Sequence, residues 1–64
     1  MKIVKRKNEL VVCFPEKVVK LKGHQDNDFF TLFTESLELN SSLSEKDKKL
    51  LIAELQKEKD IVIG

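Results

Sequence analysis

Three side chains that could bind a metal ion lie close together in one polar stretch of this 64-residue sequence. His24, Asp26 and Asp28 alternate there, and imidazole and carboxylate groups are common metal ligands. The sequence holds no second histidine, and its single cysteine lies well before this stretch. Asp and Asn also stabilise turns through local backbone hydrogen bonds. The stretch is therefore more typical of a solvated turn, and we predict neither a metal site nor a cofactor.

Cys13 is the only cysteine that could act as a nucleophile. It lies within the apolar run of residues 10–14, and no histidine lies nearby in the sequence to activate it. A cysteine inside an apolar strand usually packs as a small core residue. A single cysteine also excludes a disulfide within the chain. The sequence therefore predicts no enzymatic activity.

Lysine and arginine side chains, which bind phosphate groups, are concentrated in the first third of the sequence. Residues 1–22 carry seven lysines and arginines against two acids, and residues 23–64 carry five lysines against nine acids. The net charge of +1 thus combines a segment of +5 with a segment of −4. Such asymmetry indicates contact with nucleic acid, although a single lysine on a strand also serves as a solvated residue that prevents aggregation.

The small size of the chain limits how its fold can be stabilised. A domain of 64 residues buries only about 60% of its unfolded surface, and neither a disulfide nor a structural metal is expected to help. We therefore expect a partner chain to complete the fold. The sequence has no run of roughly 18 apolar residues that could span a membrane and no signal-like apolar segment, so we expect a cytoplasmic protein without membrane contact.

The apolar pattern at the start of the sequence predicts two strands. Residues 2–7 alternate β-branched and basic side chains, which is typical of a half-exposed strand. Residues 10–14 are uniformly apolar and predict a strand that is buried on both faces. Asn8 and Glu9 between them predict a two-residue turn.

A proline and a glycine then suggest the two ends of a short helix. Pro15 suits the first turn of a helix, and Gly23 suits a left-handed helix stop. Residues 16–22 therefore predict two helical turns. The polar residues 24–28 predict a loop.

A β-hairpin is predicted after this loop. Residues 29–34 are strong β formers, residues 37–39 alternate as a short strand, and residues 35–36 between them predict a turn. The phenylalanines in this segment could stack on single-stranded bases, as in sheet-based RNA-binding proteins. Their spacing, without interleaved arginines, is more typical of core residues. Overall the sequence predicts a mostly β fold with short helices.

This order of elements resembles the AbrB/MazE-like family of transition-state regulators and antitoxins, which has the swapped-hairpin fold. In that family a Lys/Arg strand, an asparagine-containing turn and an apolar strand ending in proline precede a two-turn helix, a glycine, an acidic loop and a strand hairpin. The matching residues are Lys5, Arg6, Asn8, Val11, Val12, Phe14, Pro15, Val18, Val19, Leu21, Gly23, Asp26, Asn27, Asp28 and residues 29–39.

The resemblance implies an intertwined swapped-hairpin β-barrel homodimer that binds double-stranded DNA as a transcriptional regulator. The resemblance implies that Arg6 donates two hydrogen bonds to the edge of a guanine in the major groove and that Lys5 and Lys7 contact phosphates. Asn8 and Lys2 complete the predicted DNA-binding set. Strict strand alternation, however, places Lys5 and Lys7 on one face and Arg6 on the other.

The C-terminal part of the sequence predicts one longer helix. A polar linker around residue 41 separates an expected DNA-binding and dimerisation domain, residues 1–40, from an expected helix and tail, residues 41–64. Ser44 and Asp47 have the spacing of a capping box. They predict a helix that begins at residue 45 and ends near residue 59.

Two roles for this helix remain open. The favoured one is that it covers the core of the dimer. In the alternative, Leu51, Ile52 and Leu55 enter a groove on a toxin, and Ile61 and Ile63 add a further anchor or strand.

Two functions likewise remain open. The first is a homodimeric, sequence-specific DNA-binding regulator, which could be an antitoxin that autoregulates its operon. The second is a protein-interaction module on the same fold without DNA binding. The basic segment favours the first function. The second is favoured by two departures from the family, namely the missing glycine before Asn8 and the replacement of a basic residue by Cys13.

Overall fold

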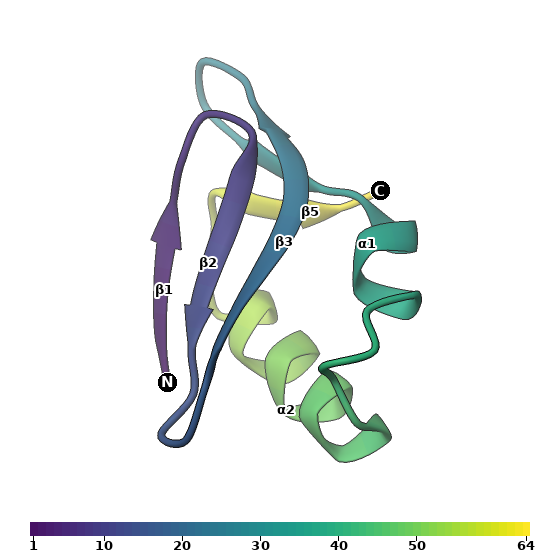
Figure 1. Cartoon of the computed structure of the whole chain (residues 1–64). Helices are drawn as coiled ribbons and strands as arrows, with labels where there is room; N and C mark the ends of the chain where they lie inside the picture. Colours follow the sequence, from purple (N-terminus) through teal and green to yellow (C-terminus); the bar gives the residue numbers. More distant parts are fainter.

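Alternating apolar and charged residues build the first three strands as an antiparallel meander. In the computed structural model, which describes residues 1–64, these strands are β1 (Lys2–Lys5), β2 (Glu9–Cys13) and β3 (Val18–Gln25) (Figure 1). Each strand pairs with the next in an antiparallel register. The register places Val12 of β2 between Ile3 and Val19, so that one face of the meander is apolar.

Both turns of the meander contain two central residues. The Arg6 N–H donates to the Glu9 carbonyl oxygen over 2.9 Å, so the first turn is centred on residues 7–8, one position earlier than predicted. The Phe14 N–H donates to the Lys17 carbonyl oxygen over 2.8 Å, which makes residues 15–16 the centre of the second turn. Proline suits such a turn because its ring fixes φ near the required value.

The helix predicted for residues 16–22 is wrong, because this segment belongs to β3. The decisive pattern is a period of two, in which Val19 and Leu21 are buried while Lys20 and Lys22 are exposed. A helix would place these residues at about 100° intervals and could not separate them in this way. Pro15 therefore marks a turn and not the start of a helix.

Gly23 is the point at which β3 changes its partner strand. Before it β3 pairs with β2, and from Gly23 onwards it pairs with β4 (Phe30–Leu32). A Cβ atom at Gly23 would lie 2.5 Å from the Phe30 ring and closer still to the Thr31 carbonyl oxygen. No residue has a positive φ, so Gly23 is required for this close approach and not for a left-handed helix stop.

The second predicted hairpin is also wrong after its first strand. β4 is followed by the helix α1 (Thr34–Glu38), which replaces the predicted turn and the predicted strand at residues 37–39. A strand would place Leu37 and Leu39 on one face. In the structure Leu37 is buried, whereas Leu39 is 79% exposed.

The helix predicted from residue 45 is confirmed as α2 (Glu45–Gln56), which ends three residues earlier than expected. Ser44 and Asp47 form the predicted capping box at its start. The segment after it forms β5 (Ile61–Ile63), which pairs with β4 in parallel. The five strands therefore make one sheet in the order β1-β2-β3-β4-β5.

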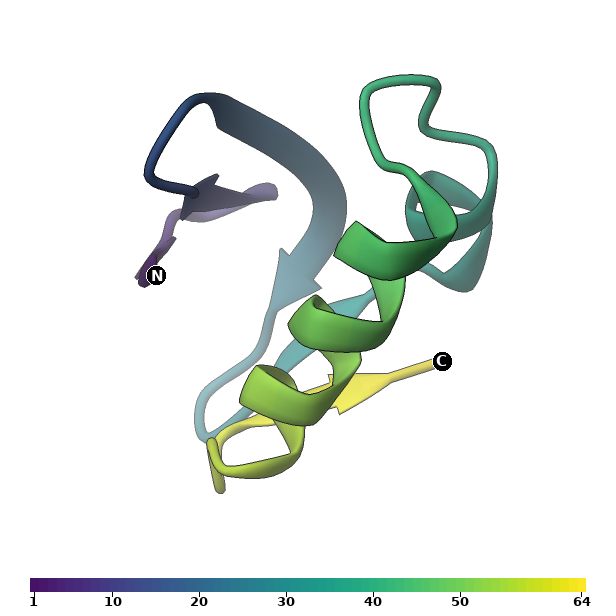
Figure 2. The same cartoon turned by 90° about the horizontal axis from the view of Figure 1, so that it is seen from below.

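One hydrophobic core joins all parts of the chain. Figure 2 shows α2 lying along the inner side of the curved sheet, and Leu51 and Leu55 of this helix are almost fully buried. Residues 41–64 thus pack on the same core as residues 1–40. The core residues are Leu10, Val12, Phe14, Val19, Leu21, Phe30, Leu32, Leu37, Leu43, Leu51, Leu55 and Ile61. The fold is mostly β with two short helices, and neither helix has the length and apolar composition needed to cross a bilayer.

A polar contact fixes the second turn of the meander to the start of α2. The Lys17 ammonium lies 2.6 Å from Asp47 Oδ2 and 2.6 Å from the Ser42 carbonyl oxygen, and it lies 5.5 Å from the centre of the Phe14 ring. The hydrogen bond from Lys17, together with one from the Ser44 N–H, lowers the pKa of Asp47. The ionised pair therefore contributes to stability.

The first prediction concerns the close approach at Gly23. Replacing Gly23 by Ala should destabilise the fold by about 1–3 kcal/mol, because the new methyl group overlaps backbone and a buried ring. Urea unfolding followed by circular dichroism measures the change. Gly64→Ala is the matched control, since its Cβ would meet the Thr31 methyl group at 3.4 Å, an ordinary contact. Equal stability of both variants would contradict the prediction.

The second prediction concerns the pH dependence of the Lys17–Asp47 pair. The pKa of Asp47 is lower in the folded chain than in the unfolded chain, so the stabilisation is complete above the unfolded pKa and is lost as the pH falls through the folded pKa. Lys17→Met should therefore be less stable than the wild type at about pH 7, and this gap should narrow as the pH falls through the folded pKa of Asp47. The contacts of Lys17 with the Ser42 carbonyl oxygen and the Phe14 ring do not depend on Asp47, so part of the gap should remain. Lys49→Met, at an exposed lysine without an ion pair, should show no such difference. A gap between wild type and Lys17→Met that does not change with pH would argue against the pair.

Candidate nucleic-acid interface

The meander has one face that no helix covers. We call this the outer face, and it consists of the side chains of Lys2, Val4, Glu9, Val11, Cys13, Val18, Lys20 and Lys22. Their strand positions alternate with those of the core residues, so they point away from the core. Figure 1 shows both helices on the opposite side of these three strands.

The outer face carries more cations than acids. Lys2, Lys20 and Lys22 are all exposed, and none of them forms an ion pair within the chain. Glu9 is the single acid, and it lies directly opposite Lys22 in the ladder. Arg6 follows β1 and stands opposite Glu9, to which it is joined by the turn hydrogen bond. This face therefore offers several cations that are free to bind an anion.

The turn at one end of the outer face is held rigidly by backbone contacts. The carbonyl oxygen of Lys7 accepts from the Gln25 N–H over 3.0 Å, and that of Asn8 accepts from the Gly23 N–H over 3.2 Å. The side chains of Arg6, Lys7 and Asn8 remain exposed at this turn. Three of the predicted DNA-binding residues thus lie together on a fixed support.

Lys5 does not lie with the other predicted DNA-binding residues at this end of the outer face. It lies opposite Leu10, so its side chain starts on the inner side of β1, and its ammonium group forms an ion pair with Asp60 just before β5. Lys5 therefore ties the first strand to the segment that leads into the last one. This ion pair was not expected from the sequence, where Lys5 is predicted to contact phosphate, and Lys2 is the only lysine of β1 without an ion pair.

The outer face also carries apolar side chains. Val4 and Val11 lie in its middle row, and Cys13 and Val18 lie in the end row with Lys2, where Val18 is 61% exposed. Cys13 is half-buried on this face and does not belong to the core, contrary to the sequence-based interpretation. Each of the three rows of the ladder also carries one lysine, namely Lys2, Lys20 or Lys22.

The phenylalanines divide between the core and the surface. Phe30 is fully buried, as predicted, whereas Phe29 and Phe33 are 49% and 45% exposed, so their assignment to the core was wrong. The Phe33 N–H donates to the Lys22 carbonyl oxygen over 3.1 Å, which fixes this residue beside β3. An exposed aromatic ring thus lies next to one of the cations of the outer face.

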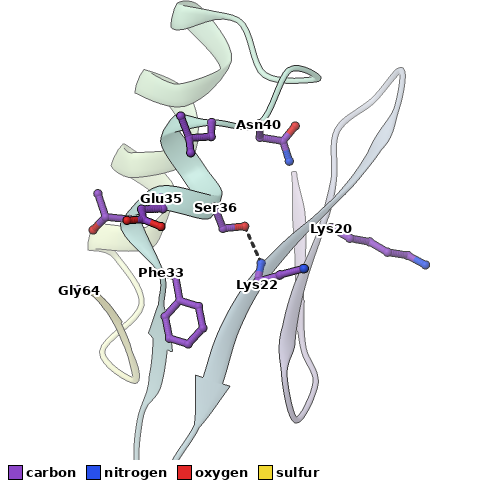
Figure 3. A pocket seen from close by; sticks show the side chains of 9 residues that line it. Lys20, Lys22, Phe33, Glu35, Ser36, Asn40 and Gly64 are labelled. Carbon is purple, nitrogen blue, oxygen red and sulfur yellow. Dashed lines mark hydrogen bonds between the residues drawn. The ribbon is translucent and has the colours of Figure 1, made fainter.

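A groove of about 810 Å³ runs between the end of β3 and α1 (Figure 3). Its lining residues are Lys20, Lys22, Phe33, Thr34, Glu35, Ser36, Leu39, Asn40 and Gly64. The Lys22 N–H donates to Ser36 Oγ over 2.7 Å, which joins the two walls of the groove. The groove could not be predicted from the sequence, because both of its walls were expected to belong to other elements. The alternating residues 18–24 were the signal that could have located β3.

The remaining predicted sites are distributed through the fold. Leu51, Leu55 and Ile61 lie in the core of the chain, whereas the alternative role of this helix would have them enter a groove on a toxin. Ile52 packs against the core and is half-buried, and Ile63 is 40% exposed on β5.

The polar loop brings two of its three expected metal-binding side chains together. His24 Nε2 lies 3.3 Å from Asp26 Oδ1, and both side chains are largely exposed. No group of three His, Cys, Asp or Glu side chains in the chain has an arrangement that could hold a metal ion. The arrangement is a contact between two exposed polar side chains, and such surface contacts contribute little to stability.

Comparisons with known proteins give no match that could identify these features. No protein-family model, curated protein or solved structure matches the chain. The resemblance to the AbrB/MazE-like family thus rests on residue pattern alone, and its helix at residues 16–22 and its complete hairpin at residues 29–39 do not occur in the structure. The outer face and the groove are the two surface features that point to a function.

Proposed function

We propose that this chain is a binding protein and not an enzyme, and that its ligand is double-stranded DNA. The observation that carries the proposal is the set of four unpaired cations at one helix-free face, namely Lys2, Arg6, Lys20 and Lys22, with Glu9 as the only acid among them. Cations on one rigid surface bind DNA because they neutralise phosphates and release counterions.

The turn supplies the residues that could distinguish one base pair from another. A two-stranded ribbon fits the major groove, and an arginine at its tip can donate two hydrogen bonds to guanine. Arg6 has this position, while Lys7 and Asn8 beside it can contact phosphate and sugar groups. This arrangement supports a role as a sequence-specific transcriptional regulator, including that of an antitoxin that represses its own operon.

A homodimer is part of the same proposal. A 64-residue chain is close to the lower size limit for a stable domain, and a second copy would double the number of phosphate contacts. The swapped-hairpin arrangement is one way to build such a dimer. A melting temperature that rises with protein concentration would support it, and a monomeric mass by light scattering with a constant melting temperature would oppose it.

The protein-interaction module is the second candidate function. The groove beside α1 favours it, because exposed Phe33 and Leu39 occupy its surface. A toxin is one partner that such a surface could bind.

The third prediction tests the outer face with matched charge reversals. Lys20→Glu combined with Lys22→Glu should weaken binding of a fluorescent DNA duplex by about tenfold or more, because two cations are lost and two repulsive charges are added. Lys49→Glu combined with Lys59→Glu changes the net charge equally on exposed lysines away from this face and should weaken binding much less. Fluorescence anisotropy over a salt series measures both affinity and the number of ions released.

A conservative variant separates base reading from charge. Arg6→Lys keeps the cation but loses the forked donor, so it should cost about 1–3 kcal/mol of discrimination at one base pair with little change in nonspecific affinity. Equal losses in the two double variants, or wild-type binding that does not depend on salt, would rule out the outer face as a DNA-binding surface.

A further inference from the structure

One edge of β3 has backbone groups without a partner strand. In an antiparallel ladder, alternate residues direct their N–H and C=O groups to opposite sides of the strand. Hydrogen bonds from Gly23 to Asn8 and from Phe14 to Lys17 show that odd-numbered residues of β3 direct these groups towards β2. Val18, Lys20 and Lys22 therefore direct theirs towards the other edge.

Only one of these three residues has partners on that edge. Lys22 donates its N–H to Ser36 Oγ and accepts at its carbonyl oxygen from the Phe33 N–H. β4 begins to pair with β3 at Gly23, so no strand lies beside Val18 and Lys20. Two donors and two acceptors, at the spacing of a strand, thus remain open on this edge of β3. Lys20 lines the groove, and Val18 continues the same edge beyond it.

The groove supplies side chains that match an acidic and apolar segment. Lys20 and Lys22 stand along one wall, and Glu35 is the only acid among the lining residues. Phe33 is 45% exposed and Leu39 is 79% exposed, so the groove also presents apolar surface. Its volume of about 810 Å³ is in the range of pockets that bind a ligand.

We propose that this groove binds an extended acidic segment of a different protein, which adds as a strand to the open edge of β3. Its backbone would pair with Val18 and Lys20, its carboxylates would lie beside the two lysines, and its apolar side chains would cover Phe33 and Leu39. This inference does not depend on DNA binding.

Two observations favour a segment of another protein over a nucleic acid or a second copy of this chain. The phosphodiester backbone of a nucleic acid has acceptors but no alternating donors, so it would leave the carbonyl groups of Val18 and Lys20 unpaired. A second copy of the chain offers the edge strands β1 and β5 and the open edge of β3 itself, and none of these three strands contains an acidic residue. A strand from another protein satisfies both the backbone groups and the charges.

The experiment uses the peptide acetyl-Glu-Val-Glu-Val-Glu-amide and the whole chain labelled with ¹⁵N. Titration followed by NMR should move the amide signals of Val18 and Lys20 most, and their hydrogen exchange should slow by about tenfold at saturation. The same peptide with lysine in place of glutamate should bind at least about tenfold more weakly because it repels Lys20 and Lys22. A version that is N-methylated at both valines and at the central glutamate should not bind, because either edge of its backbone is then blocked.

A pair of variants at one position isolates the backbone contribution. Lys20→Ala and Lys20→Pro remove the same charge, but only the proline removes the N–H that faces the groove. This N–H makes no bond within the ladder, so proline is compatible with the edge. Lys20→Pro should bind the peptide about tenfold more weakly than Lys20→Ala, and both should bind duplex DNA equally. Duplex DNA binding by the two variants therefore tests the proposed function independently of peptide binding.

Four outcomes would overturn the proposal. They are equal peptide affinity of the two Lys20 variants when both are folded, equal binding of the N-methylated peptide, signal changes that lie outside β3 and the residues lining the groove, and no binding at about 1 mM peptide. The N-methylated peptide tests the backbone without any change to the protein. Shifts of the Val18 and Lys20 amides by a single-stranded oligonucleotide, with none by the peptide, would assign the groove to nucleic acid instead.

Discussion

The close approach of β4 to Gly23 is the constraint on which the arrangement of the sheet depends. Because a side chain at this position would overlap Phe30 and the Thr31 backbone, only glycine lets β3 leave β2 and continue beside β4. This change of partner curves the sheet around α2 and places Phe30 in the core. It also leaves the first half of β3 with one open edge. The core and the proposed peptide groove therefore have the same structural origin.

The basic residues of the first third of the chain have two different roles in the fold. Lys5 and Lys17 form ion pairs that join strands to the C-terminal segment. Lys2, Lys20 and Lys22 alternate with core residues and project from the helix-free face. The lysines of the first third that form no ion pair and alternate with core residues therefore gather on one face of the protein. A count of charges along the chain cannot separate the two roles, because the distinction depends on strand register and on distant acids.

Sequence reasoning succeeded where the signals were local. The capping box of α2 and the apolar run of β2 predicted their elements correctly, because both depend on neighbouring residues. It failed where distant contacts decided the outcome. Pro15 and Gly23 suit a short helix when considered alone, but a turn hydrogen bond and the approach of β4 determine their roles. Of the candidate site, Lys2 and the exposed turn residues were predicted, whereas Lys20 and Lys22 were hidden in the misassigned helix.

The parallel pairing of β4 with β5 sets the order in which the chain can fold. The meander of β1, β2 and β3 is joined by short turns, so its contacts form with little loss of chain entropy. The hydrogen bond from Phe30 to Asp60, in contrast, closes a loop that contains both helices. Long-range contacts of this kind slow folding. During synthesis on the ribosome, the sheet therefore stays incomplete until β5 has emerged, and β4 keeps one unpaired edge for that period.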